Sequence, residues 1–268
     1  MDISKLIFLA LCFFAPVSCS RSGSGSVEKE TLYQVATLQS LMAGNYDGYV
    51  SIGELRAHGD VGLGTFDRAN GEMIVLDGCV YQALGDGTVV VADDSGTTPF
   101  STVTWFDADI CPEIQPFDSL SGLESQLDSA VYAYGRNFIY AVCLDINVCG
   151  VTFRSELPQE KPYGPLSEVL PLKQRSFSCE DISGTVVGVC FPSFFSGQNT
   201  TGWHFHFISS DRKQGGHLLE ISSSEISTAQ LDATPYFNLY LPQDSSFSRR
   251  NLSEDFSDAI ELMEHSAR

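Results

Sequence analysis

The sequence predicts an α+β fold made of mixed and antiparallel β-sheets with few helices. Three observations support this prediction. Short apolar runs rich in β-branched residues recur along the chain and are separated by glycine-containing turns. Helical periodicity occurs in only a few places. The regular alternation of strands and helices that is typical of a doubly wound parallel sheet is absent.

The first part of the chain predicts one helix and a series of hairpin strands. Apolar residues at helical spacing predict a helix over 33–42. Asp77-Gly78 and the Gly85-Asp-Gly87 segment are turn sequences of the kind that join antiparallel strands. The strands predicted around these turns are 73–76, 80–83 and 88–91.

The middle of the chain predicts a second helix over 120–134, where Leu123, Leu127 and Val131 recur every four residues. Strands are predicted at 138–145 and 151–153. Four prolines over 158–171 then predict a long irregular connection. The remaining predicted elements are strands at 185–191, 203–209, 218–221 and 237–241, and a short helix over 255–265.

Composition restricts the function classes. The chain has 268 residues, of which 43% are hydrophobic and 18% are charged, so it can form an extensive core in one large domain or two small ones. Its formal net charge is -19, and no run of basic residues occurs. Nucleic-acid and anionic-lipid binding both depend on clustered Lys and Arg, so we expect neither kind of partner.

Residues 1–20 have the build of a secretory signal peptide. Lys5 precedes an apolar run over 6–17 that is too short to span a bilayer, and small residues follow. We therefore expect a secreted protein with no membrane contact after signal removal. Lipid anchoring at Cys19 is disfavoured, because Pro16 and Val17 precede it where such signals carry a leucine and a small residue. Residues 21–30 are predicted to be a flexible lead-in, and 31–268 the folded part.

Cysteines and sequons bear on the secretory interpretation. Six cysteines remain after the signal segment, and either disulfides or buried free thiols would account for them. They are Cys79, Cys111, Cys143, Cys149, Cys179 and Cys190. Asn199 and Asn251 each begin a glycosylation sequon, which would be used only in a eukaryotic secretory route.

Three of the five histidines lie close together, at His204, His206 and His217. On a strand, alternate side chains share a face, so His204 and His206 point one way while the aromatic residues between and beside them pack the other way. The polar loop over 209–216 ends in two glycines and can return the chain as an antiparallel neighbour. The register that would bring His206 opposite His217 is left open. Three neutral imidazoles with a vacant position are typical of a catalytic zinc site.

The histidines alone leave several interpretations open. A secreted zinc metallohydrolase would use a zinc-bound hydroxide as its nucleophile. A cupin-type enzyme would place a glutamate three or four residues after the second histidine, where this chain has Ser210 and Asp211. A non-catalytic secreted metal-binding protein is the third alternative.

Longer segments resemble the α-acetolactate decarboxylase family, in order from about residue 32 to residue 264. They are GTFD (64–67), GEMIVLDGCVYQ (71–82), QEKPY (159–163), GWHFHFISSD (202–211) and GGH (215–217), with LMAGNYDG (41–48) and IGELRAHGD (52–60) further upstream. The resemblance implies two similar α+β halves, divided near 155–175, and a homodimer. It implies decarboxylation of 2-acetolactate to (R)-acetoin and CO2, with zinc as Lewis acid and a glutamate as proton donor.

The resemblance also implies roles for individual residues. His204, His206 and His217 match the zinc ligands. Glu72 matches a catalytic glutamate near the metal, Arg154 a substrate-binding and catalytic arginine, and Thr65 a nearby substrate-binding threonine. Glu264 matches a C-terminal catalytic glutamate, for which Glu261 is the alternative. Without the resemblance, Glu72 would be interpreted as a solvated rim carboxylate and Arg154 as a surface ion-pair partner.

Overall fold

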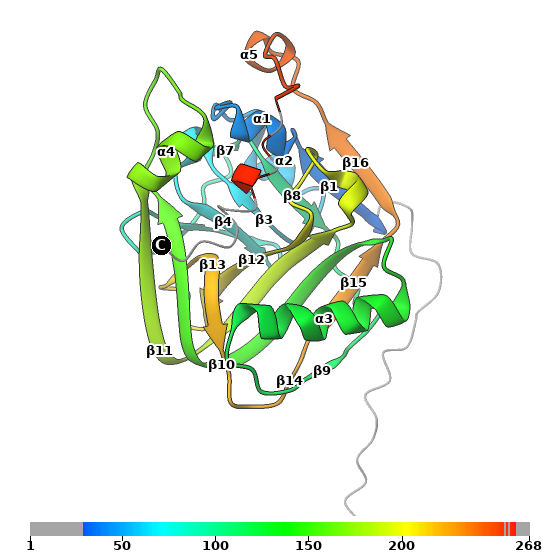
Figure 1. Ribbon diagram of the computed structural model, residues 1–268. Coiled ribbons are helices and arrows are strands. Elements are labelled where there is room, and N and C mark those ends of the chain that lie inside the picture. The colour runs from blue at the N-terminus through cyan, green and yellow to red at the C-terminus, as the bar shows by residue number, and fades with distance from the viewer. Residues whose placement is uncertain (1–28, 255, 257, 261–268) are drawn as a thin grey trace, which may run out of the picture.

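The computed structural model describes residues 29–254, 256 and 258–260 (Figure 1). The expected signal peptide (1–20) and Glu261 and Glu264 lie outside the described residues. Most of the expected lead-in (21–30) also lies outside them. Of the predicted tail helix (255–265), residues 256 and 258–260 are described, and 258–260 is helical.

The first large sheet has seven strands in the order β16-β1-β8-β3-β4-β5-β6. Its strands are β1 (Thr31–Val35), β3 (Val61–Thr65), β4 (Glu72–Leu76), β5 (Cys79–Ala83), β6 (Val89–Val91), β8 (Ser101–Thr104) and β16 (Tyr236–Tyr240). All neighbours are antiparallel except β1 and β16, which are parallel. The sheet is therefore mixed, as predicted.

The second large sheet closes on itself, because β10 pairs with β11 along one edge and with β13 and β15 along the other. Its strands are β10 (Ile139–Glu156), β11 (Gln174–Phe191), β12 (Gly202–Ser209), β13 (Gly215–Ser222) and β15 (Gln230–Thr234). Two small pairs complete the strands: β2 (Val50–Ser51) with β7 (Thr97–Thr98), and β9 (Glu113–Ile114) with β14 (Ser227–Thr228).

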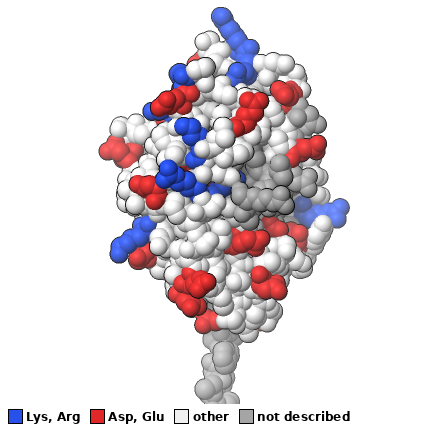
Figure 2. Space-filling view, turned by 60° about the vertical axis from the view of Figure 1, so that its left-hand side comes forward, with Lys and Arg blue, Asp and Glu red and all other residues white. Residues whose placement is uncertain are grey.

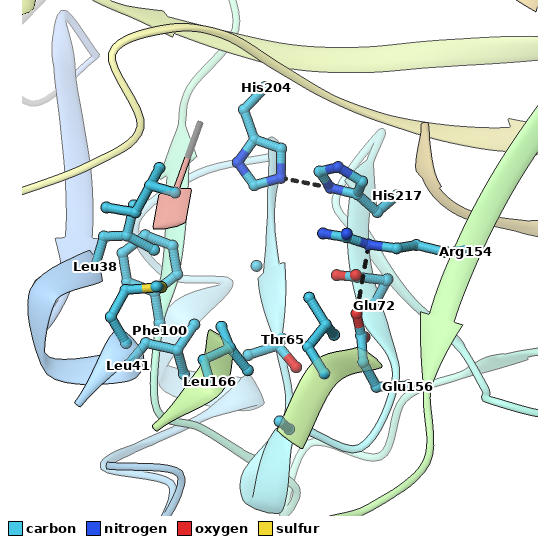
Figure 3. Close-up of a pocket in the computed structure, with 15 residues that line it drawn as sticks. Leu38, Leu41, Thr65, Glu72, Phe100, Arg154, Glu156, Leu166, His204 and His217 are labelled. Atoms are coloured by element: carbon cyan, nitrogen blue, oxygen red, sulfur yellow. Dashed lines mark hydrogen bonds and ion pairs between the residues drawn. The ribbon is translucent and has the colours of Figure 1, made fainter. Parts of the chain in front are cut away.

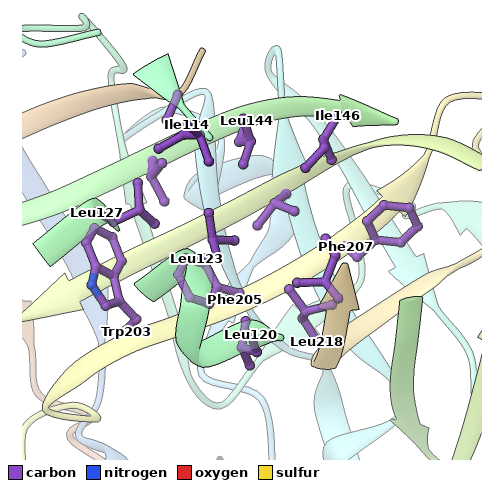
Figure 4. Packing of buried hydrophobic residues seen from close by; sticks show 14 of the residues in the cluster. Ile114, Leu120, Leu123, Leu127, Leu144, Ile146, Trp203, Phe205, Phe207 and Leu218 are labelled. Carbon is purple, nitrogen blue, oxygen red and sulfur yellow. The ribbon is translucent and has the colours of Figure 1, made fainter. Parts of the chain in front are cut away.

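The helices are short apart from α3. They are α1 (Leu38–Met42), α2 (Ile52–Leu55), α3 (Leu120–Tyr134), α4 (Leu166–Lys173) and α5 (Ser245–Ser248), with 3-10 turns η1 (Asp67–Ala69) and η2 (Ser193–Phe195). The hydroxyl of Ser119 caps α3 by accepting from the Gly122 N–H. Helix α3 lies across the second sheet (Figure 1), and its buried leucines pack against Trp203 and Phe205 of β12 (Figure 4).

The two large sheets pack against each other through buried aliphatic side chains. Val61 and Ile74 of the first sheet contact a cluster that contains Val187 and Ile208 of the second. This packing places β4 beside β12 and β13, and it therefore brings the GEM segment close to the histidine strands.

The predicted α+β class is confirmed, as are the helix over 120–134 and the hairpin strands around Asp77-Gly78. The helix predicted over 33–42 is wrong in its first half. Val35 belongs to β1 and pairs with Ser101 and Tyr240, and Ala36 breaks the backbone with a φ of 54° before the helix begins at Leu38. Sheet pairing here outweighs the helical spacing of the apolar residues.

Three other boundaries differ from the prediction. The strands predicted at 138–145 and 151–153 are one continuous strand, β10, and 185–191 is only the end of β11. The irregular connection predicted over 158–171 contains helix α4, with Pro171 inside it. Leu166 and Leu170 of α4 are buried, and this packing outweighs the backbone hydrogen bond lost at Pro171. Strands β1, β3, β8 and β15 were not predicted.

The structure also bears on the secretory features. No disulfide joins any two of the cysteines in residues 29–254, and burial raises the pKa of the Cys190 thiol to about 12. The side chain of Asn199 is buried and its Nδ2 donates to Gln34 Oε1 over 2.8 Å, so attachment of a glycan there would require this side chain to leave its buried position. Asn251 is exposed, and its glycosylation stays a prediction.

Acidic and basic side chains are interspersed on the face of the molecule seen in Figure 2. Within the described part of the chain, the helices are all too short or too polar to cross a membrane.

Candidate active site

The three histidines come together on two neighbouring strands. His204 and His206 alternate on β12, and His206 lies directly opposite His217 of β13. Trp203 and Phe205 point to the opposite side, into the core beneath α3. The predicted shared face of the two imidazoles is therefore confirmed, and the register that the sequence left open is the one that pairs His206 with His217.

Glycine is required where β13 approaches β10. Gly216 has a φ of +155°, and a Cβ added there would lie 2.2 Å from the carbonyl oxygen of Arg154. His217 follows directly and pairs with Arg154 in the β10–β13 register. The double glycine of the GGH segment thus lets the third histidine and the arginine lie side by side.

The imidazole nitrogens have the spacing of metal ligands. His204 Nε2 lies 3.2 Å from His206 Nε2 and 3.0 Å from His217 Nδ1, and the three ligand atoms all lie within 4.8 Å of one another. Nitrogens bound to a tetrahedral zinc ion at its usual bond length are about 3.3 Å apart. All three histidines are buried.

The surroundings of His206 keep it in the form that binds a metal. Its Nδ1 lies 2.8 Å from the carbonyl oxygen of Met73, to which it donates, so the lone pair of the neutral ring lies on Nε2. Burial lowers the pKa of His206 well below its ordinary value, and the nearby His204 lowers it further. A neutral imidazole with a fixed tautomer is the ligand that a divalent transition metal requires.

Glu72 reaches this cluster from the first sheet. It begins β4 and is buried, and its Oε2 lies 3.4 Å from His206 Nε2. Thr65 is its partner on β3 and donates through Oγ1 to the Gly71 carbonyl over 2.8 Å. The interpretation of Glu72 as a solvated rim carboxylate is therefore wrong.

Arg154 is also buried at the site, so its interpretation as a surface ion-pair partner is wrong. It is 5% exposed, and its Nε lies 3.7 Å from Oε1 of Glu156. Its Nη1 donates to Gln174 Oε1 over 3.5 Å. Glu156 was not among the predicted site residues. Its position two residues after Arg154 on a strand could have indicated it, once the strand was known to continue to residue 156.

These residues surround one pocket, whose empty space is about 580 Å³ when its opening to solvent is included. His204, His217, Arg154, Glu72 and Glu156 form its polar side (Figure 3). Apolar side chains form the other side, and they are Leu38, Leu41, Met42, Ala69, Phe100, Leu166, Leu170 and Ile260.

The structure therefore brings together Thr65, Glu72, Arg154 and the three histidines, while Glu261 and Glu264 lie outside the described residues. His58 is elsewhere, stacked on Tyr33 with ring centroids 3.9 Å apart. The donor set fits a divalent metal ion, since three neutral nitrogen ligands leave coordination positions for oxygen atoms of a bound molecule. A guanidinium and a carboxylate beside these positions suit a small anionic hydroxy or keto compound.

Comparisons with known proteins agree with this arrangement. The sequence profile described as "Alpha-acetolactate decarboxylase" matches residues 32–254. The alpha-acetolactate decarboxylase of Methanosarcina mazei is 40% identical over 235 residues, which cover 88% of this chain and 80% of that protein. The crystal structure of the Bacillus subtilis strain 168 enzyme superimposes with a TM-score of 0.84 at 34% identity, covering 88% of this chain and all of that one.

A Staphylococcus aureus protein of unknown function, described as similar to alpha-acetolactate decarboxylase, superimposes with a TM-score of 0.79 at 27% identity. The match covers 86% of this chain and 97% of that one. From the extent of these matches, together with the histidine hairpin and its pocket, we conclude that the chain belongs to the alpha-acetolactate decarboxylase family.

Proposed function

We propose that this chain is a zinc-dependent carboxy-lyase that converts 2-acetolactate to (R)-acetoin and CO2. Membership of the family supports decarboxylation of acetolactate. The observation that carries the proposal further is the cluster of three buried imidazoles, two of which line one pocket together with Arg154 and Glu72.

The two sides of the pocket match the two ends of the substrate. The guanidinium of Arg154 binds the carboxylate, because its planar fork pairs with two carboxylate oxygens. The apolar side of the pocket, which includes Leu41 and Phe100, would accommodate the two methyl groups of 2-acetolactate. Thr65 lines the same space and limits the position of the ligand beside Glu72.

His204, His206 and His217 would hold the zinc ion. When bound there, zinc supplies Lewis-acid polarisation of the ketone oxygen, which absorbs the negative charge that develops as CO2 leaves. The chain's own contribution is to fix the ligand tautomer through the Met73 carbonyl and to keep the site buried from bulk water.

Glu72 is proposed to manage the proton. The bond between the carboxylate carbon and the tertiary carbon breaks, CO2 departs, and the electron pair stays on the remaining carbon skeleton as an enediolate. A proton delivered from a carboxyl group to one face of that carbon gives (R)-acetoin. Glu72 lies at the histidines, and the resemblance assigns a second such role to Glu264, so either residue is a candidate donor.

Two further proposals concern the intact protein. We propose that residues 1–20 direct export, because they combine a lysine, a short apolar run and small residues. We propose that the mature chain forms the homodimer implied by the family resemblance.

The deciding experiment is acetoin formation from racemic 2-acetolactate by the purified mature protein. The assay is made before chelation, after chelation, and after zinc is added back. We expect acetoin to form, to stop on chelation and to return with zinc. A protein that binds zinc stoichiometrically but forms no acetoin would overturn the proposal and favour a metallohydrolase. Undiminished acetoin formation in metal-free protein would overturn the role of zinc.

A further inference from the structure

We propose that Glu156 determines which anions the pocket accepts. Its carboxylate holds the guanidinium of Arg154 in position and makes the pocket select ligands with one carboxylate over ligands with two. This inference rests on the proposed function only in taking a small hydroxy acid as the ligand of the pocket.

Arg154 and Glu156 are neighbours inside the binding space. They are two residues apart on β10, so their side chains leave the same face of the strand, and both line the pocket (Figure 3). Arg154 Nε and Glu156 Oε1 lie 3.7 Å apart, and the two side chains are only 6% and 7% exposed. An anion that reaches Arg154 therefore also meets the carboxylate of Glu156.

Contacts with β5, β11 and β13 fix the backbone of β10 around Ser155. Ser155 points away from the pocket, and its hydroxyl donates to the Ala83 carbonyl over 2.6 Å. Arg154 pairs with Ser176 of β11 on one side and with His217 of β13 on the other. A slip of one residue would turn every side chain to the opposite face, and these contacts prevent it. Glu156 is thereby held at the pocket.

The charges then define the ligand class. Arg154 is the one Lys or Arg among the described residues that line the pocket, whereas Glu72 and Glu156 both carry carboxylates. The first carboxylate of a ligand shares the guanidinium with Glu156. Apart from the zinc ion proposed at the histidines, these lining residues offer no further cation. A second carboxylate that does not reach that ion would lie beside Glu156 in a buried space, and like-charge contacts of this kind reject a wrong ligand.

The apolar side of the pocket favours the same class of ligand. Leu38, Leu41, Phe100 and Leu166 form an apolar surface across from the charged pair (Figure 3). Burying a charged substituent against such a surface is unfavourable, whereas an alkyl group gains from it. The pocket is therefore built for a monoanionic hydroxy acid whose other substituents are neutral.

Two unreactive probes test this selectivity. 2-Hydroxyisobutyrate and 2-methylmalate both carry a hydroxyl, a methyl and a carboxylate on one tertiary carbon, and only the second has another carboxylate. Their dissociation constants are measured by calorimetry on the zinc-loaded mature protein and on Glu156→Gln, which removes the negative charge and leaves a side-chain carbonyl of similar size beside Arg154. We expect the wild type to prefer 2-hydroxyisobutyrate, and the ratio of affinities to shift toward 2-methylmalate by about tenfold or more in the variant.

The proposal is overturned by an unchanged ratio in a folded, zinc-loaded Glu156→Gln protein, by a wild-type preference for the dianion, or by failure of the wild type to bind either probe at millimolar concentrations. Glu156→Asp keeps the charge and is expected to keep the wild-type ratio. A purely structural role would lower the melting temperature of Glu156→Gln without moving the ratio.

A second comparison covers the case in which Glu156→Gln does not fold. Arg154→Gln and the double variant Arg154→Gln/Glu156→Gln differ only in the carboxylate, and the double variant buries neither charge of the pair. Removal of Glu156 in that background should again favour 2-methylmalate, and an unchanged ratio would overturn the proposal. These binding experiments do not measure acetoin. A protein that shows this selectivity but forms no acetoin in the activity assay would refute the proposed reaction and leave the role of Glu156 standing.

Discussion

Arg68 and Gln159 join two distant segments of the chain around the pocket. The Gln159 N–H donates to the Arg68 carbonyl over 2.7 Å, and Arg68 Nε donates back to the Gln159 carbonyl over 2.8 Å. Arg68 and Ala69 have φ values of 64° and 48°, a left-handed conformation that is unfavourable for residues other than glycine. Glu72 follows this turn. The reciprocal bonds therefore stabilise the strained loop that leads into β4, and they give the QEKPY segment a structural role.

Replacement of Arg68 by Met should destabilise the protein and weaken catalysis together. The substitution keeps the aliphatic part of the side chain but leaves the Gln159 carbonyl without its donor, at a cost of about 1–3 kcal/mol in the free energy of unfolding. We expect this loss in denaturant titrations, with a lower kcat. Arg56→Met is the matched control, because Arg56 Nε also donates to a backbone carbonyl, that of Gly78 over 3.1 Å, but in an exposed position. Equal losses in the two variants would contradict this role.

Replacement of His206 by Ala should remove the metal. It deletes one of three nitrogen ligands and the contact with the Met73 carbonyl that fixes its tautomer. Metal analysis after dialysis should fall from about one ion per chain to well below that value. His58→Ala, which changes a histidine outside the pocket, should retain the metal. Stoichiometric metal in His206→Ala would disprove the assignment of the site.

Replacement of Arg154 by Lys should reduce turnover without releasing the metal. Lysine keeps the positive charge but lacks the planar fork that orients a carboxylate. Loss of one charge-assisted hydrogen bond predicts a fall in kcat/KM of about 10- to 100-fold, measured with 2-acetolactate. Arg175→Lys is the control, since Arg175 is an exposed β11 residue that pairs with Ser155. Unchanged kcat/KM in Arg154→Lys would exclude substrate orientation by this residue.

Asp232 should make the stability of the fold depend on pH. Burial raises the pKa of this carboxyl to about 8, and the neighbouring Asp109 raises it further while the Asp107 N–H lowers it. The folded pKa lies above the unfolded value, so folding takes up a proton. The contribution is complete below the unfolded pKa of about 4 and is lost as the pH rises toward 8, by at most about 1.4 kcal/mol per unit.

The substitution Asp232→Asn should flatten this dependence. Unfolding free energies measured between pH 5 and pH 8 should decline less steeply in the variant than in the wild type. Asp107→Asn, at an exposed neighbour whose backbone N–H is retained, serves as the control. Parallel pH profiles for wild type and Asp232→Asn would show that the carboxyl of Asp232 does not titrate in this range.

The local sequence pattern was sufficient to predict the shared face of His204 and His206 and the helix α3, but not the register that pairs His206 with His217. A period of two over 203–209 predicted which face carries the imidazoles, and recurrence of Leu123, Leu127 and Val131 predicted the buried stripe of the helix. Both features depend on residues close in the chain, so they can be derived from spacing alone.

The features that residue spacing did not predict depend on pairing between strands that are far apart in the sequence. Val35 has the spacing of a helix but pairs with β8 and β16, far along the chain. The convergence of Glu72 and Arg154 on the histidines depends on the packing of two sheets and on the β10–β13 register, so before the structure it could be expected only from the family resemblance. Glu156 depended on knowing how far β10 extends.

The carbonyl that fixes the tautomer of His206 belongs to Met73, on the other large sheet. The metal site is therefore complete only when both sheets have formed. The residues that meet there are far apart in the sequence, and contacts over long sequence separations slow folding. A partly folded chain would expose the same three imidazoles without the partner that prepares them. Loading with metal should thus follow folding, and the amount of metal that a preparation takes up at saturating zinc becomes a count of the molecules that have reached the native state.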